Sequence, residues 1–236
     1  PEALKKTPGF WVRVGGEVYQ NPQTPLHSLP DLPHPEYKGF DDRLMNKPMQ
    51  GRIYKMINIE TDRGCPYQCT YCAAPHLAAQ NREAGLGKYF RFLDADQIID
   101  QIHYQIETHQ PEFLYFSSET FLSMKSDVFD KFVEKYADIG LPFWFQTRFE
   151  TVSLDRMQAL KNVGMFWSTF GVEHGNFEFR RDVLKRPYKN EKAIEIAELM
   201  AHLDIGASLN NIIGFPGEGR KLIFDAIDLN RQMFKI

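Results

Sequence analysis

The chain has 236 residues, of which 43% are hydrophobic and 25% charged, with a formal net charge of −3. This length fits one domain with a core large enough to fold without disulfide staples. The small net charge gives no sign of a broad nucleic-acid surface, and no run of 18 apolar residues predicts a transmembrane helix. The first residues, PEALKKTPGF, hold neither a signal-peptide core nor an initiator methionine, so we expect a cytoplasmic chain excised from a longer protein.

The first fifty residues differ in composition from the rest. Eight of the 14 prolines lie in residues 1–50. Residues 10–19, FWVRVGGEVY, alternate around Gly15-Gly16 and predict a short hairpin. Residues 21–37, NPQTPLHSLPDLPHPEY, predict an extended strap. We therefore divide the chain into an N-terminal hairpin with a proline-rich linker, residues 1–50, and a main domain, residues 51–236.

From residue 53 onward, apolar strand patterns alternate with amphipathic helix patterns. Strands are predicted over 53–61, 112–118, 141–149, 165–173 and 207–215, and helices over 94–109, 127–140, 153–164, 190–206 and 220–234. Strict alternation predicts an α/β fold with a parallel sheet and right-handed crossovers. A doubly wound sheet and a (β/α) barrel both satisfy this pattern. In either, ligands bind beyond the carboxyl ends of the strands.

All three cysteines, Cys65, Cys69 and Cys72, lie in one loop after the first predicted strand, spaced C-x3-C-x2-C. An odd, clustered count argues against a disulfide framework. Buried unreactive thiols, a structural zinc site with His76 as fourth ligand, and a redox pair that leaves Cys65 unexplained are alternatives. A [4Fe–4S] cluster held by three thiolates accounts for the count, because a missing fourth cysteine leaves one iron open.

The motifs of this chain resemble those of the radical S-adenosylmethionine (SAM) enzymes from about residue 50 to the end. CPYQCTYC fits the C-x3-C-x-aromatic-C signature of that family. Four further segments resemble family motifs at the strand ends and occur in the family's order. They are SSE (117–119) in place of Gly-Gly-Glu, FGVEHG (170–175), GNFEFRRDVLKR (175–186) and NIIGFPGE (211–218).

The resemblance implies a partial (β/α)6 TIM-like barrel, here truncated to about five βα units, preceded by the hairpin and the strap. The first fifty residues are similar to the segment that joins a cobalamin-binding domain to the barrel in the B12-binding subgroup. No Asp-x-His-x-x-Gly cobalamin motif occurs in this chain, so cobalamin would require an upstream domain. A sixth strand is expected beyond Ile236.

The resemblance also assigns roles to residues at the strand ends. Cys65, Cys69 and Cys72 would ligate the cluster, and Glu119, with Ser117 and Ser118 beside it, would accept the SAM ammonium group. Glu173 would accept the ribose hydroxyls. The SAM carboxylate would pair with Arg180, which the family spacing favours, or with Arg148. The adenine would lie against Tyr71, Ile213 and Gly214. Gln146 and His174 are candidates for substrate contact, and a structural role for His174 is equally open.

The implied reaction is reductive cleavage of SAM to a 5′-deoxyadenosyl radical, which abstracts hydrogen from an unknown substrate. The aromatic content of 14% suits a hydrophobic substrate, although core packing explains it as well. The chain could be the barrel of a cobalamin-dependent methyltransferase, a cyclase or an oxidoreductase. A methylthiotransferase is the alternative within the family, and a non-catalytic iron–sulfur or zinc protein is the alternative outside it. Expected partners are SAM and a reductant such as flavodoxin or ferredoxin.

Overall fold

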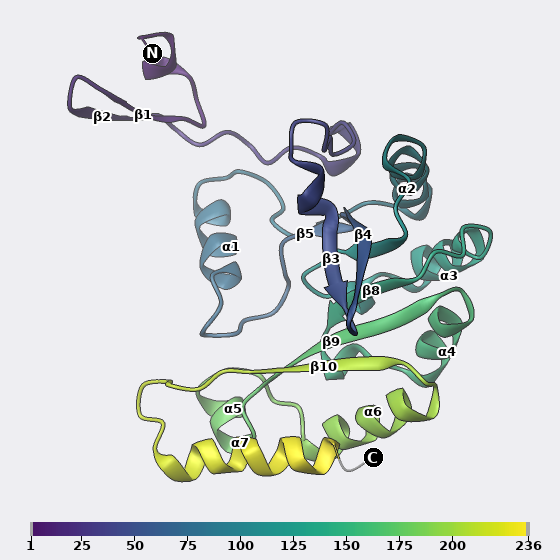
Figure 1. Ribbon diagram of the computed structural model, residues 1–236. Helices are drawn as coiled ribbons and strands as arrows, with labels where there is room; N and C mark the ends of the chain where they lie inside the picture. The colour runs from purple at the N-terminus through teal and green to yellow at the C-terminus, as the bar shows by residue number, and fades with distance from the viewer. Residues whose placement is uncertain (1, 235–236) are drawn as a thin grey trace.

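The computed structural model describes residues 2–234 and is built around one six-stranded sheet with the order β10-β9-β8-β7-β4-β3 (Figure 1). The strands are β1 (Trp11–Val14), β2 (Glu17–Gln20), β3 (Asn46–Met49), β4 (Arg52–Ile59), β5 (Asp62–Arg63), β6 (Arg91–Phe92), β7 (Phe113–Phe116), β8 (Phe143–Thr147), β9 (Met165–Glu173) and β10 (Gly206–Asn211). The helices are α1 (Ala74–Glu83), α2 (Ala95–His109), α3 (Ser126–Tyr136), α4 (Leu154–Asn162), α5 (Phe177–Asp182), α6 (Asn190–His202) and α7 (Arg220–Met233).

The strand order confirms the predicted barrel type. Strands β4, β7, β8, β9 and β10 are parallel and neighbour one another in chain order, while β3 pairs antiparallel with β4 at the edge. A doubly wound sheet would reverse its strand order at a switch point, and this sheet does not. The fold is therefore an α/β half-barrel of five βα units, with β3 and β10 as its edges.

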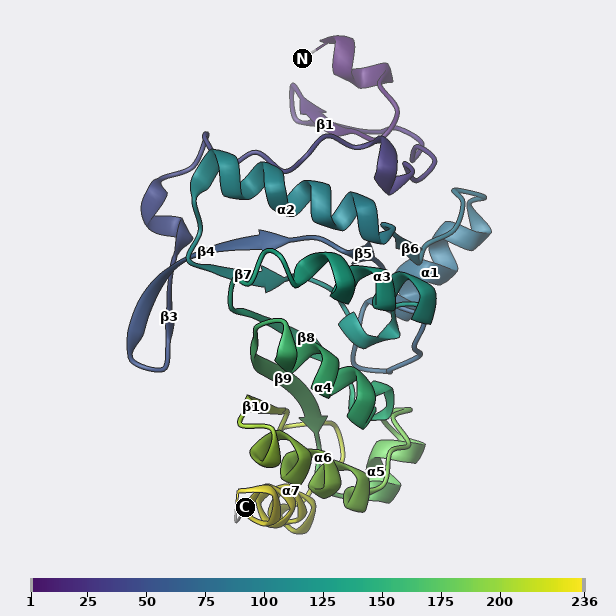
Figure 2. The ribbon, with the colours of Figure 1, turned by 90° about the vertical axis from the view of Figure 1, so that its right-hand side faces the viewer.

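The outer face of the sheet forms the core because alternate strand residues are apolar. Ile57, Leu114, Phe116 and Phe143 are fully buried and pack under the helices. Helices α2, α3, α4 and α6 follow one another along this side (Figure 2). On α2 the isoleucines at helical spacing face the core, with Ile98 and Ile102 fully buried. The helix begins with a capping box in which Asp94 and Gln97 satisfy each other's backbone N–H groups.

Four short features have no counterpart among the predicted elements: β3, helix α1, helix α5 and the β5–β6 pair. Helix α1 buries only Ala74 and therefore lacks an apolar stripe. Strand β3 contains Pro48, which is tolerated because β3 is an edge strand. Strand β10 ends at Asn211, before the predicted end at residue 215.

The N-terminal segment contains the predicted hairpin. Gly15 and Gly16 both have positive φ, as a two-residue type I′ turn requires. The strap runs across α2 (Figure 2), where Gln105 Nε2 donates to the carbonyl oxygen of Pro35 at 2.7 Å and Leu29 is buried in the core. The domain boundary at residue 50 stays a prediction, and residues 1, 235 and 236 of the two predicted segments lie outside the described range. Among residues 2–234, no helix is both long and apolar enough to cross a membrane.

Candidate active site

The cysteine loop leaves β5 and runs to α1 along the carboxyl-end rim of the sheet. It starts at Gly64, whose φ is +87° and where a Cβ would lie 2.6 Å from the carbonyl oxygen of Tyr89, so only glycine fits. Thr70 fastens the loop to the segment after α5, because its Oγ1 donates to the carbonyl oxygen of Val183 at 2.7 Å. Cys65 is half-buried, Cys69 buried and Cys72 exposed, and within residues 2–234 all three thiols are free.

A cavity of about 340 Å³ opens beside this loop. It is bounded by the cysteine loop and by the ends of β7, β8, β9 and β10. Eight of the predicted site residues line it, namely Cys65, Cys69, Tyr71, Cys72, Glu119, Gln146, Arg148 and Glu173. The convergence of these side chains follows from the topology, since parallel strands bring their carboxyl ends to one rim.

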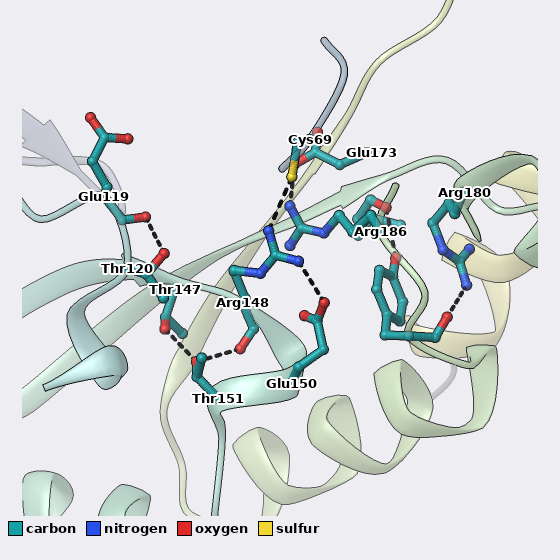
Figure 3. Close-up of polar contacts among 12 residues, drawn as sticks. Cys69, Glu119, Thr120, Thr147, Arg148, Glu150, Thr151, Glu173, Arg180 and Arg186 are labelled. Atoms are coloured by element: carbon teal, nitrogen blue, oxygen red, sulfur yellow. Dashed lines mark hydrogen bonds and ion pairs between the residues drawn. The ribbon is translucent and has the colours of Figure 1, made fainter. Parts of the chain in front are cut away.

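Arg148 connects the cysteine loop to the end of β8 (Figure 3). Its Nη1 donates to Cys69 Sγ at 3.2 Å and its Nη2 to Glu150 Oε1 at 2.7 Å. The guanidinium also lies over the ring of Tyr67, 3.7 Å from the centroid. Burial raises the pKa of the Cys65 thiol, whereas the backbone N–H of Tyr67 and the charge of Arg148 act in the opposite direction. The arginine thus supplies positive charge where thiolates are needed.

Arg186 is a site residue that the sequence analysis missed. Its Nη1 donates to Glu173 Oε1 at 2.9 Å and to the Tyr71 hydroxyl at 3.1 Å. Its Nε and Nη2 are buried and have no hydrogen-bond partner among the described residues. Glu173 has a positive φ of 65° at the end of β9, and its carboxylate lies over Gly171. A buried guanidinium with unpartnered N–H groups at a cavity suits an anionic ligand.

Arg180, favoured above for the SAM carboxylate, does not reach the cavity. It is fully buried, and its Nη2 donates to the carbonyl oxygen of Tyr188 at 2.8 Å and to Asn190 Oδ1 at 2.6 Å. Figure 3 shows it apart from the Cys69–Arg148–Glu150 chain. This placement gives Arg180 a structural role and corrects the expectation.

His174 is also buried outside the cavity, which corrects its expected substrate contact. Its Nδ1 accepts from the backbone N–H of Asn176 at 2.9 Å, and its Nε2 lies 3.0 Å from Glu218 Oε1. Burial lowers the pKa of His174. The Glu218 carboxylate in turn accepts the backbone N–H groups of Gly214 and Phe215. His174 therefore anchors the loop after β10.

The remaining predicted residues lie at the margins of the site. Ser117 and Ser118 do not line the cavity, and the Ser118 side chain is fully buried. Ile213 is 65% exposed, and Gly214 has a φ of +93° in the loop after β10. Cavity residues that the sequence analysis did not name are Thr120, Thr147, Thr169, Gly171, Arg186, Asn210 and Ile212. Thr169 and Gly171 on β9 and Asn210 on β10 follow the inward-facing period of their strands, which was the available signal.

The donor set consists of three cysteine thiols on one loop. Within the described part of the chain, no group of three or more His, Cys, Asp or Glu residues could hold one ion. A structural zinc site needs four such ligands together. Three free thiols on one loop, without a fourth, suit a larger cluster with one open iron.

A comparison with known families agrees with this chemistry. The profile of the Radical SAM superfamily matches residues 59–229, most of the chain. The chain belongs to the Radical SAM superfamily. Its members are enzymes that use a [4Fe–4S] cluster and SAM. The match begins at the last residue of β4 and covers the cysteine loop and strands β7, β8, β9 and β10.

Known radical SAM proteins resemble the chain over parts of their length. A curated protein of Methanocaldococcus jannaschii, named "Putative methylthiotransferase MJ0865", is 23% identical over 202 residues, which are 80% of this chain and 41% of that protein. The cobalamin-dependent SAM radical enzyme OxsB, with aqua-cobalamin and SAM bound, has a TM-score of 0.69 at 18% identity, covering 96% of this chain and 32% of its own. The methyltransferase TsrM from Kitasatospora setae, with tryptophan and a SAM analogue bound, has a TM-score of 0.64 at 14% identity, covering 75% and 34%.

These likenesses confirm the fold and its similarity to cobalamin-binding radical SAM proteins. The chain spans about a third of the length of those two solved proteins and 41% of the curated relative. Reaction and substrate are therefore matters of proposal.

Proposed function

We propose that this chain is the catalytic barrel of a radical SAM enzyme, with Cys65, Cys69 and Cys72 as the three protein ligands of the cluster. One observation carries the proposal. The three cysteine thiols are free and adjoin a cavity whose wall holds buried guanidinium nitrogens that have no hydrogen-bond partner within residues 2–234. Such a site leaves an iron open and offers charge-assisted donors to the carboxylate of a bound amino acid.

When bound, the cluster and SAM supply one-electron reductive chemistry that yields a radical able to abstract hydrogen from a substrate. The residues of this chain bind and orient. Glu119 has an exposed side chain at the cavity and would accept the SAM ammonium group. Arg186, together with Arg148, which also lines the cavity, would donate to the carboxylate. Glu173, held by Arg186, would accept the ribose hydroxyls.

Arg148 has a second task in this proposal. Its guanidinium donates to Cys69 Sγ and is itself held by Glu150. A positive charge at hydrogen-bond distance stabilises a thiolate and leaves the cysteine ready to ligate iron.

Within the family, a cobalamin-dependent methyltransferase, cyclase or oxidoreductase is favoured. The fold likeness to OxsB covers 96% of this chain, whereas the likeness to TsrM covers 75%. The sequence likeness to the Methanocaldococcus jannaschii protein supports methylthiotransfer as the second candidate. A hydrophobic substrate, a flavodoxin or ferredoxin as reductant, and a cytoplasmic location complete the proposal.

Anaerobic reconstitution tests it. The parent chain should take up about four irons and four sulfides, the content of a cubane cluster. Alanine at Cys65, Cys69 or Cys72 should abolish the EPR signal of the reduced cluster, while His76→Ala serves as the control and should leave it unchanged. Stoichiometric zinc without iron uptake, or loss of the cluster in His76→Ala, would contradict the three-thiolate site.

A further inference from the structure

Ser118 occupies a position where the family motif has glycine, and its hydroxyl makes two hydrogen bonds. The residue is fully buried and does not line the cavity. Its Oγ donates to Asp62 Oδ2 and accepts from the backbone N–H of Thr120 at 3.2 Å. One hydroxyl therefore ties both flanks of Glu119 to a second segment of the chain.

Asp62 belongs to β5, which leads directly into the cysteine loop, and the residue is only 5% exposed. Its Oδ2 also accepts from Thr61 Oγ1 at 2.9 Å. The backbone N–H of Glu119 also faces the Asp62 carboxylate and partly opposes the rise in its pKa that burial causes. Asp62 Oδ1 itself has no hydrogen-bond partner among the described residues. Among the residues that the structure describes, no cation pairs with this carboxylate, so its burial is costly.

Glu119 is held by its neighbours while its own side chain stays free. It is exposed, but Ser118 and Thr120 on either side are 0% and 2% exposed. Thr120 Oγ1 donates to the carbonyl oxygen of Glu119 at 2.7 Å, and Gln146 Nε2 donates to that of Ser118 at 3.1 Å. The backbone at Glu119 is thus fixed from three sides.

We propose that Asp62 and Ser118 are positioning residues, which lock the backbone of Glu119 to the root of the cysteine loop. The carboxylate that accepts the SAM ammonium group and the loop that holds the cluster then form one rigid unit. This inference rests on the proposed function, in which Glu119 binds SAM. It explains why serine is suitable here, since glycine would offer no hydroxyl to bridge the two segments.

A structural role alone does not account for Asp62. Desolvation raises its pKa to about 6, so an ionised carboxylate at neutral pH destabilises the fold. A buried group that lowers stability is typical of functional sites. Replacement by asparagine should therefore leave the cluster-free chain at least as stable while loosening Glu119.

The test compares Ser118→Ala and Asp62→Asn with the parent and with Ser168→Ala. Ser168 is an equally buried serine whose Oγ donates at 3.4 Å to the carbonyl oxygen of Phe145, away from the cavity. Three quantities are measured: the Kd of SAM by EPR titration of the iron-loaded protein, hydrogen exchange of residues 117–120 in the cluster-free chain, and the Tm of that chain.

We expect the Kd of SAM to rise about tenfold or more in Ser118→Ala and Asp62→Asn, as when supporting partners of a binding group are lost. Hydrogen exchange at Thr120 should accelerate in both, and the Tm of Asp62→Asn should not fall. Ser168→Ala should match the parent in Kd and in exchange.

Two outcomes overturn the inference. If the parent responds to SAM and both variants bind it as the parent does, Asp62 and Ser118 do not position Glu119 and only this inference fails. If an iron-loaded parent shows no response to SAM, the proposed function fails and this inference fails with it.

Discussion

Gly171 is the residue at which a single methyl group should move the carboxylate of Glu173, which we propose to accept the ribose hydroxyls. A Cβ at this position would lie 2.0 Å from Glu173 Oε1, 3.0 Å from its Cδ and 3.1 Å from Arg186 Nη1. The φ of Gly171 is not positive, so the backbone conformation suits alanine and the effect of the substitution depends on the space around the added methyl group. Because non-bonded heavy atoms settle near 3.5 Å, the carboxylate has to withdraw by roughly 1–1.5 Å.

The consequence for Gly171→Ala is a selective loss of SAM affinity. Withdrawal breaks the 2.9 Å pair between Glu173 and Arg186 and displaces the acceptor of the ribose hydroxyls. Loss of one charge-assisted hydrogen bond costs about 1.5–3 kcal/mol, so Kd should rise roughly ten- to a hundredfold. The buried Arg186 loses its partner too, and the free energy of unfolding should fall by about 1–3 kcal/mol.

The assay is a SAM titration of the reduced, iron-loaded protein, followed by EPR, with thermal unfolding of the cluster-free chain alongside. Gly206→Ala is the matched control, since its Cβ would lie 1.9 Å from Trp167 Cε3, away from the cavity. It should lower the Tm but leave the Kd of SAM within about twofold, as expected for a distant site. Gly171→Ala with iron loaded and SAM bound as tightly as in the parent would refute the placement of Glu173 at the ribose.

Three further predictions concern stability and the anchoring of the rim. Because burial raises the pKa of Asp62 from 3.8 to about 6, the stability that its protonated form contributes is fully present well below pH 4 and is lost as the pH rises through 6. Urea unfolding of the cluster-free chain should therefore show Asp62→Asn gaining roughly 2–2.5 kcal/mol on the parent between pH 4 and pH 7, and parallel pH profiles would contradict this. His174→Ala removes the group that faces the buried carboxylate of Glu218. Hydrogen exchange should therefore accelerate at residues 212–218, and the free energy of unfolding should fall by about 1–3 kcal/mol. Unchanged exchange at these residues would show that His174 does not anchor the loop after β10. Ile102→Ala, at a fully buried position of α2, should lower the free energy of unfolding by about 2–5 kcal/mol without altering iron uptake per folded chain, and a loss below 1 kcal/mol would mean that α2 is not packed as described.

The strands and the larger helices could be predicted because each carries a complete periodic signal. Strand β8 alternates Phe143 and Phe145 against the core with Trp144 and Gln146 on the other face, and α2 repeats isoleucine at helical spacing. Periodicity does not encode strand order, because any βα alternation can wind in more than one way. The family motifs supplied that information, and the chain-ordered parallel sheet confirms it.

Site residues could be predicted where they stand at strand ends, but not where a turn determines which side chain reaches the cavity. Glu119 lies three residues after β7 and Glu173 is the last residue of β9, so both stand at one rim and line the cavity. Arg180 and Arg186 lie in one basic stretch, and Lys185, with a left-handed φ of 55°, turns the chain between them. A non-glycine residue in that conformation has no signature in the sequence, so spacing selected Arg180 although Arg186 lines the cavity.

Buried polar pairs between segments far apart in the sequence could not be predicted either. His174 faces Glu218 and Ser118 bonds Asp62, and each pair joins segments that come together only in the folded sheet. A histidine or serine read alone is compatible with a ligand contact and with a structural tie. The partner decides between them, and tertiary structure supplies the partner.

The most direct test of the three-thiolate site is the EPR spectrum of the reduced, fully iron-loaded chain with and without SAM. An open iron should bind SAM, so the spectrum should shift on addition, and Glu119→Ala should require more SAM for the same shift while keeping its iron. A fully loaded cluster whose spectrum ignores millimolar SAM would mean that a fourth protein ligand closes the cluster, and the enzymatic account would be contradicted.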